Sequence, residues 1–256
     1  MIKVKSFAKV NLLLKVLHKR EDGYHELQML NKKIPLYDEI SISSSNKDEI
    51  LFINENIDPS FLYKVLKQVK NIYNIEKNYK IIIEKNIPLG AGLGGASMNA
   101  ATIIDAILLD NNITETLANK INNFANLGAD IPYGFVDDMA IVEGIGEKIY
   151  IIEEKNLPSL VLVNPHILIS TKDVFENNVA YSNKYSVEDI LNKDIYENDL
   201  EQSTFAICPY IALLKQKLGK YGKVVMSGTG SSLVVHTNEF ENIKNEFPDC
   251  LVIKIN

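Results

Sequence analysis

Arginine is almost absent from this chain, since Arg20 is the only one among its 27 basic residues. Acidic residues outnumber basic ones, 33 to 27, and the net charge is −6. Proteins that bind nucleic acid or anionic membranes through charge need a basic surface. The composition therefore argues against nucleic acid and membrane as partners, including an RNA-binding role.

Cysteine is also scarce. Cys208 and Cys250 are too far apart in sequence to form a metal-ligand pair by spacing, and we interpret both as reduced thiols. No apolar run reaches membrane-spanning length, and the first residues carry neither a signal core nor a transit pattern. We therefore expect a cytoplasmic protein.

The 256 residues, 46% hydrophobic and 23% charged, are typical of a folded protein of one large or two modest domains. Apolar alternation and turn signals predict strands, and helical spacing predicts helices between them. A break near Leu157 suggests domains at 1–157 and 158–256, the second an α+β domain of ferredoxin-like type. Expected strands are 10–15, 39–43, 50–53, 79–85, 140–143, 148–152, 160–163, 223–227, 233–236 and 251–255. Expected helices are 58–73, 97–109, 114–127, 171–176 and 208–218, with a polar linker at 177–194.

A glycine-rich loop, Pro88 to Ala101, leads from a predicted strand into a predicted helix. Glycine permits positive φ and close approach of an anion, and a helix start offers unpaired N–H groups to it. The loop matches G-x-G-x-x-G only loosely, and no Gly-Lys-Ser/Thr follows to make it a P-loop. By itself it fits a phosphate-binding loop or a structural turn.

Three other segments carry polar residues in unexpected places: Lys9 on a strand, Asp130 between a helix end and Pro132, and the small-residue turn Ser227 to Ser231. Each has an ordinary structural interpretation, respectively an edge-strand charge, a turn or cap, and a hairpin. In chain order, Ala8 to Leu12, Pro88 to Ser97 and Ser227 to Ser231 together resemble the three motifs of the GHMP kinase superfamily.

The resemblance narrows to the branch that phosphorylates 4-diphosphocytidyl-2-C-methyl-D-erythritol in non-mevalonate isoprenoid biosynthesis, and it runs from about Val4 to Leu233. It rests further on Lys19 to Glu26, Leu36 to Glu39, Gly128 to Pro132 and Asn198 to Glu201. It implies an α+β fold of two domains, an N-terminal ATP domain like domain 2 of ribosomal protein S5 and a ferredoxin-like C-terminal domain, with the active site in the cleft between them.

The resemblance also implies an ATP-dependent small-molecule kinase that uses Mg²⁺, a monomer or homodimer, with Lys9 and Asp130 as catalytic residues. By the same likeness, the ATP loop comprises Pro88, Leu89, Gly90, Ala91, Gly92, Leu93, Gly94, Gly95, Ala96, Ser97 and Met98. The positions implied for the CDP-alcohol substrate are Asn11, Tyr24, His25, Thr171, Phe175, Ser227, Gly228 and Thr229.

The chain departs from the family pattern at the end of the loop. The usual Gly-Gly-Gly-Ser-Ser is here Gly94-Gly-Ala-Ser-Met98, which removes a hydroxyl that could lie near phosphate or Mg²⁺. No metal ligand is therefore named. Two alternatives stay open: another GHMP kinase, of homoserine or mevalonate type, and a non-catalytic nucleotide-binding module. Retention of both Lys9 and Asp130 argues against the second.

Overall fold

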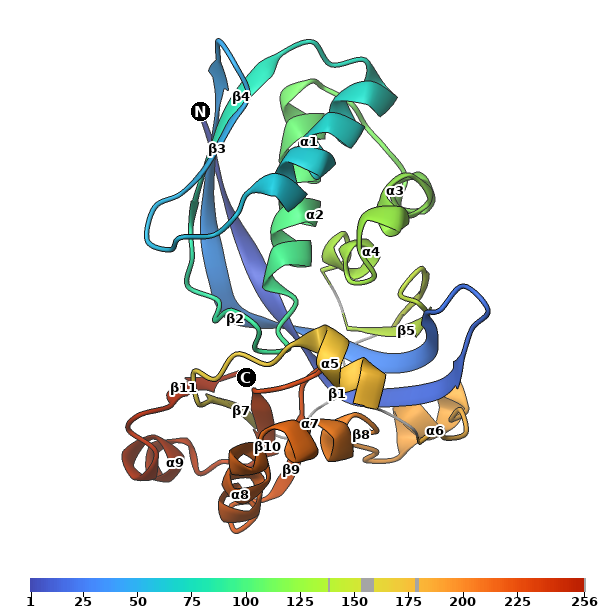
Figure 1. Cartoon of the computed structure of the whole chain (residues 1–256), viewed down its shortest axis with the longest axis vertical. Helices are drawn as coiled ribbons and strands as arrows, with labels where there is room; N and C mark the ends of the chain where they lie inside the picture. Colours follow the sequence, from blue (N-terminus) through green and yellow to red (C-terminus); the bar gives the residue numbers. More distant parts are fainter. Residues whose placement is uncertain (138, 153–158, 178–179, 256) are drawn as a thin grey trace. The chain divides into compact units, whose positions relative to one another are not determined.

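The computed structural model describes residues 1–137, 139–152, 159–177 and 180–255 (Figure 1). The chain forms two compact units, and neither is continuous in sequence. The first unit consists of residues 1–8, 35–87 and 94–137, and the second of residues 9–34, 88–93 and 138–256. The domain boundary predicted at 157/158 lies outside the described residues and stays a prediction.

Two long strands run through both units. They are β1 (Ile2–Lys19) and β2 (His25–Ser45), and the chain passes between units at Ala8/Lys9 and at Ile34/Pro35. The sequence predicts only short pieces of them, because the alternation is lost where both faces of β1 are buried, from Ala8 to Val16. Lys9 accordingly lies in an inner strand of the sheet, between β2 and β8 (Glu197–Asn198), and not at an edge.

In the first unit, the second half of β2 pairs antiparallel with β4 (Asn78–Glu84), which pairs parallel with β3 (Glu49–Phe52). Helices α1 (Ser60–Tyr73) and α2 (Gly95–Asp110) lie against this sheet (Figure 1). Their apolar residues and those of the strands form one core. It includes Ile42, Val65, Ile81, Ile104 and Phe124.

The predicted helix 114–127 is shorter in the structure. The α-helix α3 spans Leu117–Phe124, because the Thr116 side chain accepts a hydrogen bond from Asn119 N–H and so caps it. A short 3₁₀ turn, η1 (Ala125–Leu127), and the single-turn helix α4 (Ile131–Gly134) follow. This arrangement places Asp130 directly before α4.

The second unit contains β5 (Ala140–Gly144), which pairs antiparallel with the first half of β2 and with β6 (Lys148–Ile151). A separate antiparallel sheet has the order β11-β7-β10-β9. Its strands are β7 (Leu160–Asn164), β9 (Lys223–Met226), β10 (Leu233–His236) and β11 (Leu251–Lys254). Because helices follow β7 and precede β11, the order is βαββαβ, as in a ferredoxin-like domain.

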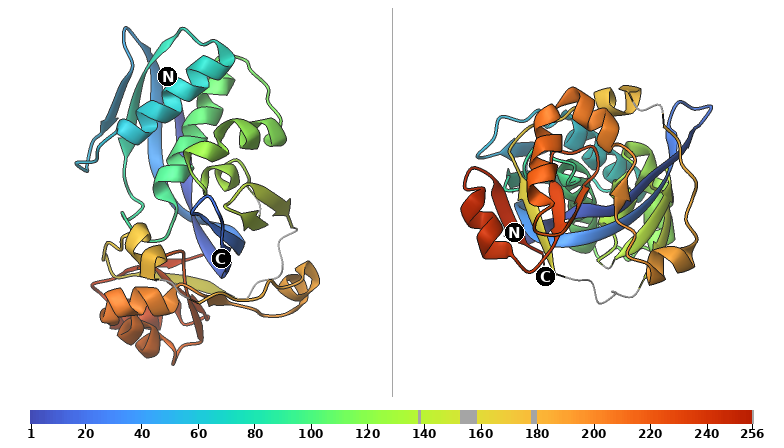
Figure 2. Two further views of the ribbon diagram at one scale, coloured as in Figure 1. Left: turned by 45° about the vertical axis from the view of Figure 1, so that its right-hand side comes forward. Right: turned by 90° about the horizontal axis from the view of Figure 1, so that it is seen from below.

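The helices of the second unit are drawn in yellow to red in Figure 2. They are α5 (Thr171–Asn177), α6 (Val187–Asn192), α7 (Glu201–Ile207), α8 (Pro209–Leu218) and α9 (Phe240–Glu246). Helix α6 lies within the segment predicted as a polar linker, and Ser186 caps it by accepting from Asp189 N–H at 3.0 Å. Among the described residues, no helix is long and apolar enough to cross a membrane.

Candidate active site

The glycine-rich loop turns its carbonyl groups toward the protein. The carbonyl oxygens of residues 90–93 accept hydrogen bonds, in order, from Ile169 N, Ser232 N, Ser227 Oγ and Lys9 N at 2.9–3.2 Å. The N–H groups of the same residues donate to no acceptor in the described part of the chain. Fixed carbonyls and open N–H groups are what an anion-binding backbone requires.

Gly92 shows why this loop needs glycine. Its φ is +72°, and a Cβ there would lie 2.0 Å from Ser227 O. No L side chain fits so close to another backbone, so Gly92 allows the loop to pack directly on the turn that follows β9. Gly90 and Gly94 also have positive φ, +56° and +69°.

The loop ends at the start of α2, a helix of 16 residues. Gly94 occupies the N-cap without a capping side chain, and the first turn contains no acidic residue. Met98 N–H donates to Gly94 O at 2.9 Å, so the open donors of the helix start are those of residues 95–97. The helix dipole adds a partial positive charge at the same place.

Lys85 lies against this helix start. A Cβ on Gly95 would be 3.3 Å from Lys85 Nζ. The ammonium group is buried and paired with Asp38, which also accepts from the N–H groups of Asn86 and Ile87 at 2.8 and 2.9 Å. This ion pair therefore fixes the chain just before the loop begins.

Met98 is a core residue. Only 2% of it is exposed, and its Cε would be 3.4 Å from a Cβ on Gly134 in α4. The side chain at position 98 therefore packs inside the first unit, and the departure from the family pattern fills apolar space there. The Ser97 side chain and the backbone N–H groups remain at the N-terminus of α2.

Asp130 lies beside the same helix start. The turn that holds it is closed by Ile131 N–H, which donates to Gly128 O at 3.1 Å. A Cβ on Gly128 would be 3.6 Å from Ser97 Oγ, so the turn 128–131 and the first turn of α2 are neighbours within the first unit. The structure thus brings together a carboxylate-bearing turn and a helix N-terminus, although the two are separated by 30 residues of sequence.

Lys9 and Asn11 form a buried polar cluster in the second unit. Lys9 Nζ donates to Asn11 Oδ1 at 2.8 Å, and Asn11 N–H donates to Ser227 Oγ at 3.1 Å. Ser227 Oγ in turn donates to Gly92 O at 2.9 Å. Three motifs that are distant in sequence therefore meet in one hydrogen-bonded network.

The turn after β9 is held by residues that the sequence analysis did not assign to the site. Asn198 Nδ2 donates to Met226 O and to Gly228 O, both at 2.7 Å, and Thr204 Oγ1 donates to Thr229 O at 3.1 Å. Thr229 and Thr171 lie side by side, with their hydroxyl oxygens 3.2 Å apart. Asn198 belongs to the segment Asn198 to Glu201, which carries part of the family resemblance. That resemblance is the sequence signal that could have assigned Asn198 to the site.

The residues predicted to recognise cytidine also meet. The rings of His25 and Phe175 stack, with centroids 5.2 Å apart and planes inclined by 26°. Burial lowers the pKa of His25 and the nearby Lys19 lowers it further, so its imidazole is neutral at pH 7. Tyr24, beside it in sequence, is 60% exposed and makes no ring contact in the described part.

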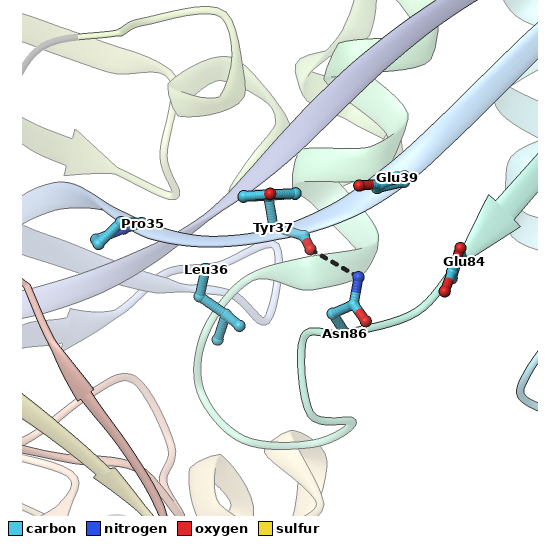
Figure 3. Close-up of a pocket in the computed structure, with 6 residues that line it drawn as sticks. All are labelled: Pro35, Leu36, Tyr37, Glu39, Glu84 and Asn86. Atoms are coloured by element: carbon cyan, nitrogen blue, oxygen red, sulfur yellow. Dashed lines mark hydrogen bonds between the residues drawn. The ribbon is translucent and has the colours of Figure 1, made fainter.

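An open hollow of about 340 Å³ lies elsewhere on the first unit, lined by Pro35, Leu36, Tyr37, Glu39, Glu84 and Asn86 (Figure 3). Glu39 and Glu84 are directly paired positions on adjacent strands. Two neighbouring carboxylates repel phosphate, so this hollow has the wrong charge for a nucleotide. None of the predicted site residues lines it. No three His, Cys, Asp or Glu side chains of the described residues form a metal cluster.

Known proteins resemble this chain in sequence. Residues 60–144 match the family model described as the GHMP kinases N terminal domain. The chain is 35% identical to 4-diphosphocytidyl-2-C-methyl-D-erythritol kinase of Clostridioides difficile, covering 91% of this chain and 85% of that one. It is 33% identical to the Bacillus cereus enzyme of the same name, with 94% and 91% coverage.

Two solved kinase structures also resemble this chain. A crystal structure of 4-(cytidine 5'-diphospho)-2C-methyl-D-erythritol kinase is 25% identical, with a TM-score of 0.82 over 100% of this chain and 99% of that one. Methanococcus jannaschii mevalonate kinase shares the fold, at 16% identity and a TM-score of 0.69 over 99% and 97% of the two chains. The predicted α+β fold and the predicted kinase family are both confirmed. The chain belongs to the 4-diphosphocytidyl-2-C-methyl-D-erythritol kinase family of GHMP kinases.

Proposed function

We propose that this chain transfers the γ-phosphoryl group of ATP to the 2-hydroxyl of 4-diphosphocytidyl-2-C-methyl-D-erythritol, giving the 2-phosphate and ADP. The observation that carries the proposal is the network joining Lys9, Asn11, Ser227 and Gly92, because it unites the alcohol-site and ATP-loop motifs. The curated relatives are named for the same substrate.

The ATP phosphates would bind along the open N–H groups of residues 90–93 and 95–97. Phosphoryl transfer depends on positioning and on neutralising charge more than on covalent chemistry. A loop whose carbonyls are all fixed, followed by an uncapped helix start, supplies both without a side chain. The buried ion pair of Lys85 and Asp38 fixes the chain beside that helix start.

Asp130 would accept or orient the proton of the attacking hydroxyl as the new O–P bond forms and the bond to the ADP oxygen breaks. Lys9 would stabilise the negative charge of the moving phosphoryl group. Bound Mg²⁺ would neutralise the phosphates, and the hydroxyl oxygen of Ser97 at the helix start is a ligand that suits it. Mg²⁺ commonly takes only one or two protein ligands when phosphates supply the others.

The cytidine base would stack on the His25 and Phe175 rings. Aromatic faces suit a planar base, and a neutral imidazole can both donate and accept hydrogen bonds at its edge. Tyr24 is exposed beside them, where it could close over the ligand. This cluster favours a CDP-alcohol over homoserine or mevalonate, neither of which carries a base.

An ADP-release assay coupled to a pyruvate kinase and lactate dehydrogenase system tests the activity, with the CDP-alcohol, homoserine and mevalonate offered separately. We expect release with the CDP-alcohol alone. Release with homoserine or mevalonate alone would point to another GHMP kinase, and release with none would point to a non-catalytic module.

Asp130→Asn tests the mechanism. We expect kcat to fall by at least about 10²-fold, as for loss of a general base, while the Kd for ATP changes less than about threefold. The matched control is Asp137→Asn, an exposed aspartate of the same unit. A kcat for Asp130→Asn close to that of Asp137→Asn would remove Asp130 from the reaction.

A further inference from the structure

Asn31 is a buried polar residue that none of the motifs includes. It lies in β2, is 0% exposed, and its Oδ1 accepts a hydrogen bond from Asn11 Nδ2 at 2.6 Å. Its own Nδ2 is fully buried and has no hydrogen-bond partner in the described part of the chain. Asn31 thus connects directly to the Lys9 and Asn11 cluster and leaves one donor unused.

The direction of this chain of hydrogen bonds is fixed by chemistry. Lys9 Nζ can only donate, so the Asn11 atom that faces it, at 2.8 Å, must be the oxygen. The other end of the Asn11 amide must then donate to Asn31, and Asn31 must accept through its oxygen. The Lys9 ammonium group therefore fixes the orientation of both amides. The series of hydrogen bonds ends at the Asn31 side-chain NH₂, which has no acceptor in the described part of the chain.

An unused buried donor is costly. Leaving an N–H group without an acceptor in a buried site costs about 1–3 kcal/mol, whereas an apolar side chain of similar size would cost nothing there. The neighbouring residues Leu30 and Met29 are apolar and buried. Position 31 therefore carries a polar group whose orientation is enforced, in a cluster that we assign to the alcohol substrate, and a bound oxygen acceptor would remove the cost.

We propose that substrate binding uncovers Asn31 Nδ2, which is fully buried in this structure, and that it then donates a hydrogen bond to a hydroxyl oxygen at the polyol end of the substrate, which makes Asn31 a specificity-determining residue. The inference rests on the proposed function. A neutral amide donor suits a neutral hydroxyl, and we assign the cationic Lys9, two residues from Asn11, to the phosphoryl group. A site built to bond a hydroxyl rejects analogues that lack it far more strongly than an apolar pocket does.

Two substitutions separate substrate binding from simple support of Asn11. Asn31→Asp keeps the size and the oxygen that accepts from Asn11 but removes the donor. Asn31→Leu removes both. We expect each to raise the Kd for the CDP-alcohol, measured by isothermal titration without ATP, by about tenfold or more, with the Kd for ATP unchanged within about twofold.

If Asn31 only holds Asn11 in place, Asn31→Asp will bind the CDP-alcohol as the unmodified protein does, and the inference is overturned. Asn111→Asp is the matched control, because Asn111 is a partly buried amide at the end of α2 that donates to Tyr79 Oη and Ile107 O, both at 2.7 Å. It should lower the melting temperature without changing either Kd.

A second measurement does not depend on the folding of any variant. The unmodified protein is titrated with CDP-alcohols that lack the 1- or the 3-hydroxyl, and we expect one of them to bind about tenfold more weakly. That analogue should lose no further affinity with Asn31→Asp. Equal binding of both analogues and the full substrate would refute the assignment, whereas no binding of the full substrate would refute the proposed function itself.

Discussion

Gly92→Ala tests the contact between the glycine-rich loop and the turn after β9. The alanine would have to adopt φ near +72°, and its Cβ would lie 2.0 Å from Ser227 O, 2.9 Å from Ser227 C and 3.0 Å from Gly230 O. All three neighbours are backbone atoms, so no side-chain rotation relieves the overlap. Either the loop or the turn must move by about 1 Å to restore a tolerable contact.

The cost has three parts. A left-handed backbone conformation costs an L residue about 1–2 kcal/mol. Overpacking of a well-packed site costs about 1–3 kcal/mol. Displacement of the loop weakens the bond from Ser227 Oγ to Gly92 O, which is 2.9 Å in the structure and contributes about 1 kcal/mol. We expect a total of about 3–6 kcal/mol, or a melting temperature lower by roughly 6–24 °C for a chain of this size.

Gly23→Ala is the matched control, because Gly23 has φ of +87° but a Cβ there would meet nothing within 4 Å. It should lose only the cost of the left-handed backbone conformation, roughly 2–8 °C in a thermal melt followed by circular dichroism. The Kd for ATP, measured by titration, should rise only with Gly92→Ala. If the two variants melt within 2 °C of each other, the loop is not packed on the turn as the structure shows.

Two further outcomes are expected. Phe175→Ala should raise the KM for the CDP-alcohol by roughly tenfold and leave the KM for ATP unchanged, since stacking on an aromatic ring contributes about 1–3 kcal/mol per base. Tyr210→Ala, on an exposed aromatic of α8, should change neither, and an unchanged KM in the Phe175 variant would contradict the stacking assignment. Burial lowers the pKa of His236 to about 4, and the positive charge of Lys223 also lowers it. The unfolded chain therefore binds this proton first, so stability should fall as the pH drops from about 6.5 to 4. In the His236→Phe variant, the free energy of unfolding should depend less on pH over the same range. An identical pH dependence in both proteins would show that His236 titrates normally.

Much of the site could be predicted because its chemistry lies in short segments. The glycine-rich loop by itself fits a phosphate-binding loop or a structural turn, and only the family resemblance favours the first. The same holds for Lys9 and Asp130. Each has an ordinary structural interpretation, and only their common resemblance to one kinase family singles them out. The structure places the turn 128–131, which holds Asp130, next to the first turn of α2, a proximity that spacing along the chain does not reveal.

Other features could not be predicted because they depend on tertiary contacts. Asn31 lies in no recognised motif. Only the structure shows that its Oδ1 accepts a hydrogen bond from Asn11 Nδ2 at 2.6 Å. Ser186 is a typical N-cap residue, so the start of α6 could have been predicted. The surrounding residues are mostly polar, however, and such a composition predicts a linker. The bounds of the two units could not be predicted from sequence either, because strands β1 and β2 run through both units.

The pairing of β1 with β8 has a consequence for synthesis of the protein. Leu13 pairs with Glu197 and Leu14 with Asn198, so each of these two residues must wait for a partner made 184 residues later. At about 5–20 residues per second, translation needs roughly 10–40 s to supply that partner. During this time the buried apolar residues Leu13 and Leu14 would lack their final neighbour. A chain with this topology should therefore depend on ribosome-associated chaperones more than one in which successive strands pair locally.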